Sequence, residues 1–306
     1  MAALQSVGRG NGSLKMKQIP RREVLGNLVT LASASVLGAG GLLACDTGAP
    51  EARSAARTTQ PLPTRRVPRQ FRSMPTAEGR GAIVHRIFPV PGFRHLDPFV
   101  VLDDFEVAQP AGFPDHPHRG FEAFTYMIEG AFHHKDNLGN DSIITAGGTQ
   151  RFTSGSGARH SEMPGAGTNN RGLQLWVNLP RIKKQIDPSY AGTPHQELPL
   201  IKTAGKTTRR IVGEGSPVKL ETAVFYEDVS LDAGSTHSVS LPEDNNHLLY
   251  LISGEVQAQG VKLAMREGIL PLSGQLDISA SRPSRFVVLS GRPHREPIYL
   301  RGPFVD

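Results

Sequence analysis

The sequence contains a single cysteine, Cys45, among 306 residues, so it offers neither a disulfide framework nor a centre of several thiolates. It also has one tryptophan and only 6% aromatic residues. No amphipathic helix of three turns stands out before residue 180, which argues against a helical bundle. What the chain does have is 33 glycines and 24 prolines, a content typical of many short strands and tight turns. A chain of this length has room for two domains.

An excess of positive charge is also missing from most of the chain. The formal net charge is +6, but residues 1–80 carry 12 Lys/Arg against 4 Asp/Glu, which leaves 22 against 24 for residues 81–306. A groove that follows phosphates needs a basic surface. We therefore expect no nucleic-acid partner.

The basic N-terminal part predicts export. Arg21 and Arg22 precede a weakly apolar run rich in Gly, Ala and Ser, which resembles a twin-arginine export signal. The run ends in "LLAC", which resembles a lipoprotein processing box and would make Cys45 a lipid attachment site. We predict that residues 1–45 are this signal and bring the protein to the periplasmic side of a bacterial cell envelope, in contact with the membrane. A transmembrane anchor is the alternative.

The sequence offers two possible starts for this signal segment. Met16 followed by Lys17 is an alternative start to Met1, because it would open a conventional signal. Residues 46–78 lack hydrophobic periodicity and predict a flexible tether.

The remaining chain predicts two all-β domains. Short apolar runs alternate with turn signals over residues 79–190 and again over 191–306, and the segment 181–210 is polar and interrupted by proline, like a connection. "LQLWVNLP" at 173–180 alternates like a half-buried strand. "YMIEGAF" and "YLISGEV" form similar hairpins in the two domains, which is consistent with a duplication.

Two pairs of possible ligands mark a candidate metal site. His116 and His118 stand two apart in "DHPHRGF", and His160 and Glu162 stand two apart in "ARHSEMP". Residues i and i+2 of a strand point to the same face, so each pair can reach one point. Nitrogen and oxygen donors suit Fe(II), Mn, Ni, Cu or Zn. The alternative is that the pairs are solvated or hydrogen-bonded polar residues.

The spacing of the residues does not decide which carboxylate would be a metal ligand. Glu122 has the same parity as His116 and His118, and so competes with Glu162. His133 and His134 lie at a hairpin and are expected to be solvated or paired with Asp136.

The run "GFRHLDPFVVLDDF…GFPDHPHRGFEAFTYMIEGAFHHKDNLGN…GGTQRFTSGSGARHSEMP…GLQLWVNLP", with the closing "GRPHREPIYLRGPFV", resembles the pirins, a family of two-domain cupins. The resemblance covers about residues 80–306 and implies a bicupin fold, two facing β-barrels, with one iron in the first. It implies the ligands His116, His118, His160 and Glu162, in preference to Glu122. "RFTSGSGARH" and "HHKD" depart from the family pattern, so changed pocket walls are expected. The second domain has His237, His247 and Glu255 without an HxH pair, and is expected to bind no metal.

Some pirins are similar to quercetin 2,3-dioxygenases. The resemblance therefore implies a dioxygenase that acts on flavonols or related phenolic substrates with O2. Glu162 would be both a ligand and the catalytic base that takes the proton of the substrate hydroxyl. The alternatives are a metal-binding protein without turnover and a structural envelope lipoprotein.

Overall fold

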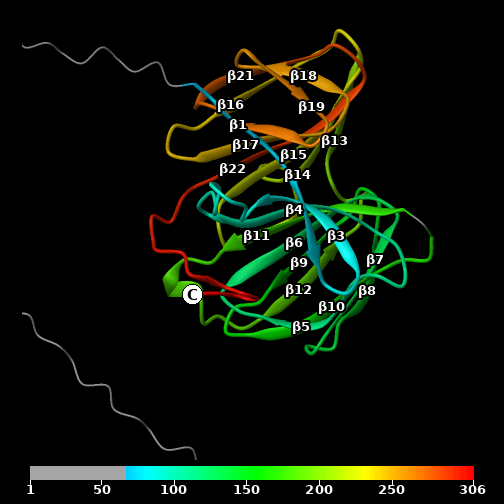
Figure 1. The fold of residues 1–306 in the computed structure, drawn as a ribbon, viewed down its shortest axis with the longest axis vertical. Coiled ribbons are helices and arrows are strands. Elements are labelled where there is room, and N and C mark those ends of the chain that lie inside the picture. The colour runs from blue at the N-terminus through cyan, green and yellow to red at the C-terminus, as the bar shows by residue number, and fades with distance from the viewer. Residues whose placement is uncertain (1–66, 168) are drawn as a thin grey trace, which may run out of the picture. The chain divides into compact units, whose positions relative to one another are not determined.

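The computed structural model describes residues 67–167 and 169–306 (Figure 1). The predicted export signal, lipidation at Cys45 and the tether up to residue 66 lie outside the described residues. The part described is built from β-strands and one short 3-10 helix, η1 (Arg181–Lys183). In that part no helix is both long enough and apolar enough to cross a bilayer. The all-β prediction is confirmed.

The first half consists of two antiparallel sheets. The seven-stranded sheet has the order β12 (Ser189–Thr193), β9 (Thr149–Thr153), β6 (Phe121–Glu129), β11 (Asn170–Asn178), β4 (Phe99–Val107), β3 (Ala82–Phe88), β2 (Met74–Glu78). The four-stranded sheet has the order β5 (Phe113–His118), β10 (Ala158–Pro164), β7 (Ala131–Asp136), β8 (Asp141–Thr145).

The second half repeats this arrangement. Its seven-stranded sheet has the order β1 (Arg69–Arg72), β20 (Glu267–Leu270), β17 (Asn246–Ser253), β22 (Ser284–Gly291), β15 (Val224–Leu231), β14 (Lys206–Val212), β13 (Leu200–Thr203). Its four-stranded sheet has the order β16 (Thr236–Leu241), β21 (Gly274–Ala280), β18 (Glu255–Ala258), β19 (Val261–Ala264). A ribbon of β23 (Leu300–Arg301) and β24 (Phe304–Val305) follows. The matching seven-plus-four pattern supports a duplication.

An apolar core joins the two halves. It contains Leu173, Leu175 and Val177 of β11 together with Leu248 and Val287 of the second half. The apolar face of β11 thus packs on the other half, whereas Gln174 and Trp176 on its opposite face are partly exposed and line a cavity in the first half.

The hairpin motif shared by the halves makes reciprocal contacts across this interface. The Tyr126 hydroxyl donates to Asp228 Oδ2 at 2.6 Å, and the Tyr250 hydroxyl donates to Asp104 Oδ2 at 2.9 Å. Each carboxylate also pairs with an arginine of its own half, Asp104 with Arg171 and Asp228 with Arg285. The tyrosines of "YMIEG" and "YLISG" thus occupy equivalent places, as a duplicated domain requires.

Two predicted boundaries are wrong. The tether does not extend to residue 78, because Arg69–Arg72 and Met74–Glu78 are strands, and β1 pairs with β20 of the second half. The sequence of these strands shows no apolar alternation, because they lie at sheet edges, where most of their side chains are exposed. The segment 181–210 is not only a connection, since it contains β12 and β13 and the start of β14; β12 still pairs with β9, so the first half extends to Thr193.

Candidate metal centre

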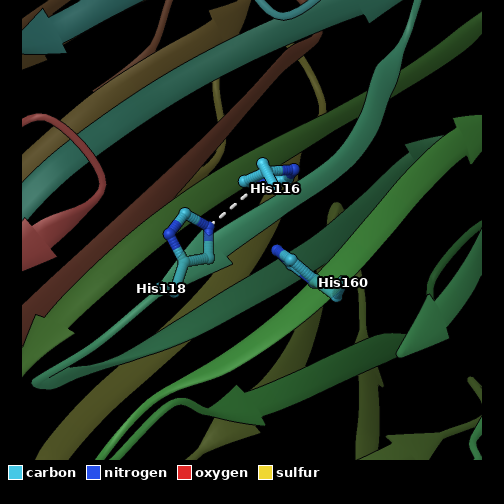
Figure 2. Close-up of side chains that lie close together, drawn as sticks. All are labelled: His116, His118 and His160. Atoms are coloured by element: carbon cyan, nitrogen blue, oxygen red, sulfur yellow. Dashed lines mark hydrogen bonds between the residues drawn. The ribbon is translucent and has the colours of Figure 1, made fainter. Parts of the chain in front are cut away.

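His116 and His118 both lie on β5, and both are oriented by backbone carbonyl groups. His116 Nδ1 lies 2.8 Å from the carbonyl oxygen of Pro114, and His118 Nδ1 lies 3.2 Å from that of Pro303. A carbonyl oxygen can only accept, so each Nδ1 carries the proton and each Nε2 presents a lone pair. The two Nε2 atoms lie 2.9 Å apart (Figure 2). Two facing lone pairs at this distance are a favourable arrangement only with a cation or a proton between them.

His160 completes the group from the neighbouring strand. Its Cα is the register partner of the His116 Cα in the β5–β10 pair. The centroid of its ring lies 4.6 Å from that of His116 and 4.9 Å from that of His118. Figure 2 shows the three side chains grouped together. Both ring nitrogens of His160 are buried, and neither has a hydrogen-bond partner within the described ranges. An unpartnered buried imidazole is costly, so this triad fits a metal ion, which would satisfy it.

The electrostatics of the site favour neutral imidazoles. Burial and, to a lesser extent, the neighbouring His116 lower the pKa of His118 to about 3, while the carbonyl of Pro303 acts in the opposite direction. Burial also holds the pKa of His160 well below its usual value, with His118 and His116 acting in the same direction. Metal ligation requires the unprotonated imidazole, so these side chains are in the ligating state at neutral pH.

Glu162 lies beside the triad rather than within it. Its carboxylate groups with His160 and His134, with ligand atoms within 4.8 Å of one another, whereas the group of His116, His118 and His160 does not include it. Oε1 accepts from the Thr125 hydroxyl at 2.9 Å and from the Gln150 amide, and Oε2 accepts from the Gln174 amide at 2.7 Å. An ionised carboxylate oxygen has two lone-pair positions, so Oε2 keeps one available.

The competing carboxylate, Glu122, lies elsewhere. It is fully buried and accepts from the Thr153 hydroxyl at 2.9 Å and from the backbone N–H of Glu221 at 2.8 Å. The parity argument fails because Gly120, with φ of 87°, turns the chain between β5 and β6. Glu122 therefore links the first half to the segment around Glu221 of the second.

His134 lies closer to the triad than its position at a hairpin predicts. Its predicted pairing with Asp136 is confirmed at 2.9 Å, but the side chain is fully buried and its ring lies 5.3 Å from that of His160. His133, by contrast, pairs with Asp141 near the surface. The alternation of Phe132 and His134 on β7 was the signal that this histidine faces inward.

The segment "RFTSGSGARH" contacts the triad through an aromatic side chain just before it reaches His160. The ring of Phe152 stacks on His160, with centroids 4.4 Å apart and planes at 9°. This aromatic contact holds the His160 imidazole in its plane.

A cavity of about 630 Å³ opens onto the site. His116, His118 and Glu162 line it, together with apolar side chains that include Val84, Val101, Phe105, Phe113, Trp176 and Leu300. The Trp176 ring stacks on Phe121 and meets the edge of His118, with centroids 4.1 and 4.9 Å apart. The wall near the imidazoles is thus flat and aromatic.

A row of polar residues crosses the inner face of the seven-stranded sheet toward this cavity. Register neighbours run from Arg86 through Asp103, Gln174 and Thr125 to Gln150. The last three hold Glu162, whereas Arg86 and Asp103 form a two-point ion pair at 2.9 and 2.7 Å that lines the cavity. The cavity therefore has polar groups at the metal ligands and again at this ion pair.

The polar residues singled out in the second half have separate partners. His237 Nε2 lies 2.7 Å from Glu227 Oε1, His247 Nδ1 lies 3.0 Å from Ser290 Oγ, and Glu255 accepts from Ser281. They do not converge on one point. The expectation of a second half without metal stays a prediction.

Comparison with known proteins gives consistent matches. Residues 81–177 match the Pirin family model, and residues 226–306 match the model of the Pirin C-terminal cupin domain. A pirin-like protein of Solanum lycopersicum is 42% identical over 238 residues, covering 74% of this chain and 82% of that protein. Human pirin is 37% identical over 241 residues, covering 75% and 83%.

Solved structures agree. A quercetin 2,3-dioxygenase from Acinetobacter baumannii superposes with a TM-score of 0.71 at 28% identity, covering 78% of this chain and 92% of that chain. A bacterial pirin of Escherichia coli in complex with nickel(II) has a TM-score of 0.61 at 22% identity, covering 74% and 100%, and supports the fold. The predicted bicupin fold is confirmed, and the chain belongs to the pirin family.

Proposed function

We propose that the chain is a metal-dependent dioxygenase that uses O2 to open the ring of a flavonol (quercetin-type) or a related phenolic compound. The observation that carries the proposal is the triad of His116, His118 and His160: the last two are buried, and the first two line a cavity of about 630 Å³. The likeness to a quercetin 2,3-dioxygenase at 28% identity supports the substrate class.

The donor set fits a transition metal, with iron as our choice and Mn, Ni, Cu or Zn as alternatives. Such an ion, when bound, supplies Lewis acidity that acidifies a phenolic hydroxyl and, for iron, a redox couple suited to O2 chemistry. His116 and His118 would present Nε2 to it, because their Nδ1 atoms are engaged by Pro114 and Pro303. His160 would present one of its unpartnered nitrogens, and Glu162 is the proposed fourth ligand.

Glu162 is also the proposed general base. It lines the cavity, and Gln174, Thr125 and Gln150 fix the position of its carboxylate. Oε2 has the one free lone-pair position, so the two proposed roles would use this atom in turn: it would ligate the ion in the absence of substrate and accept the proton of the substrate hydroxyl when substrate is bound. The fixed carboxylate would then be in place before the substrate arrives, which lowers the cost of orientation.

The cavity suits a flat, polyhydroxylated ring system. The apolar walls exclude water and pack on ring faces, and the ion pair of Arg86 and Asp103 can exchange hydrogen bonds with remote hydroxyl groups. We also propose that the protein is exported to the bacterial cell envelope, on the evidence of Arg21, Arg22 and Cys45 in the sequence.

The test is oxygen uptake by the iron-loaded protein with a panel of flavonols and simpler phenols. We expect uptake of O2 and release of carbon monoxide with at least one flavonol, and none from His160→Ala. A loaded protein that consumes no O2 with any member of the panel would instead favour a metal-binding pirin without turnover or a structural lipoprotein.

A further inference from the structure

The segment Tyr299–Asp306, here called the C-terminal strap, belongs to the second half in sequence but lies on the first half in space. In Figure 1 the red end of the chain leaves β22 of the second half and reaches the first half, where the C-terminus is marked. Val305 N donates to the Arg119 carbonyl oxygen at 3.0 Å, and Phe304 forms a parallel bridge with Arg119. Val305 is fully buried in an apolar cluster of the first half with Phe121 and Phe152. The strap is therefore a packed part of the first half.

The strap touches the metal centre directly. The Pro303 carbonyl oxygen is the acceptor for His118 Nδ1 at 3.2 Å, and Leu300, Gly302 and Pro303 line the cavity. A backbone carbonyl in this role fixes both the tautomer and the rotation of an imidazole. Without it, His118 would have no partner that directs Nε2 toward His116 and His160.

Lys184 fastens the strap to the turn that follows His118. Its Nζ donates to the carbonyl oxygens of Gly120 and Val305, each at 2.9 Å, and to Asn178 Oδ1 at 2.7 Å. The turn and the strap are in close contact at this point, since a Cβ on Gly120 would lie 1.9 Å from the Val305 carbonyl oxygen. At the surface, Arg119 pairs with Asp306 at 2.9 Å and covers the Phe304 ring at 4.8 Å.

We propose that the C-terminal strap is a positioning element of the metal site: Pro303 holds His118 in its ligating orientation, and Lys184 holds Pro303 in place. The second half thus contributes to the site through this backbone carbonyl. The inference rests on the proposed metal centre and adds Pro303 and Lys184 to it as positioning residues.

The experiment is Co²⁺ titration of the full chain, followed by visible absorption, with Lys184→Met as the strap variant. Met keeps most of the volume but removes the three hydrogen bonds. We expect the dissociation constant for Co²⁺ to rise by about 10- to 100-fold, as when an outer-shell partner of a ligand is lost, and the absorption bands of the bound Co²⁺ to shift.

Lys183→Met is the matched control. Lys183 is the neighbouring lysine and makes an ion pair at 2.7 Å with Glu221, away from the strap. We expect it to leave both the Co²⁺ affinity and the absorption bands unchanged. A general structural effect of removing a lysine and its hydrogen bonds would appear in both variants.

A second strap variant, Phe304→Ala with Asp306→Asn, loosens the strap from the exposed side and decides the question if Lys184→Met does not fold. Wild-type Co²⁺ affinity and wild-type bands in the strap variants that fold would overturn the strap inference while leaving the metal centre intact. Failure of the wild-type chain itself to bind Co²⁺ would overturn the metal centre and the strap inference with it.

Discussion

Replacing Glu162 by glutamine tests the proposed base separately from the three histidine ligands. The three imidazoles remain, so most of the metal should stay bound, while the group that takes the substrate proton is lost. Removal of a positioned general base costs about 100-fold or more in turnover, or about 2.7 kcal/mol of transition-state stabilisation at 1.36 kcal/mol per tenfold.

The surroundings of Glu162 can accept the amide, which makes this substitution informative. The new NH2 group would face the Gln174 amide, but Gln174 can rotate its amide by a half turn and accept instead. Its NH2 group would then face Thr125, whose hydroxyl can accept that bond and donate to the remaining oxygen at position 162. The cost in folding free energy should therefore be about 1 kcal/mol or less, the net value of one hydrogen bond.

The assay is steady-state oxygen uptake with the best flavonol, combined with metal content of the same samples. Glu122→Gln is the control. It should keep metal and activity, because Glu122 belongs to neither group of possible metal ligands, and an amide can donate to the Thr153 hydroxyl and accept from the N–H of Glu221. Full activity in Glu162→Gln, or loss of metal in Glu122→Gln with retention in Glu162→Gln, would refute the assignment of the carboxylate.

Three further outcomes are expected. In the metal-free protein, the free energy of unfolding should fall as pH drops from 6.5 toward 3, since the unfolded chain protonates His118 and His160 at their usual pKa of 6.5 while the folded chain does not. Together the two histidines should lower it by about 3 kcal/mol between pH 7.5 and 5.5. A urea-denaturation series that shows no change over that range would contradict the pKa shifts. Tyr126→Phe should lower the free energy of unfolding by about 1.5–3 kcal/mol, because it removes a buried hydrogen bond to the Asp228 carboxylate. A loss below about 0.5 kcal/mol in denaturant titration would show that this interface contact contributes little. Arg21→Lys with Arg22→Lys should leave the protein in the cytoplasm, and envelope delivery of this variant in cell fractionation would rule out the twin-arginine route.

Much of the fold could be predicted from the sequence because alternation and turn residues act locally. The alternation within "LQLWVNLP" predicts a strand without information from the rest of the chain, and most of this segment lies in β11. The edge strands β1 and β2 could not be predicted in this way, because most of their side chains are exposed and so need not alternate between apolar and polar residues. Their pairing with β20 and β3 depends on contacts distant in sequence.

The histidine triad followed from the i, i+2 spacing, since β5 and β10 are adjacent and each projects its pair inward. Spacing could not decide between Glu122 and Glu162, because one positive-φ glycine, Gly120, changes the phase of the following strand. Nor could it reveal Pro303, which is brought to His118 over 185 residues of chain.

The most direct measurement of the central claim is the metal content of the purified protein by elemental analysis. The account predicts about one transition-metal ion per chain in the wild type and none in His116→Ala or His160→Ala, with all three proteins folded. Retention of the ion in both variants would show that these imidazoles do not form the metal centre.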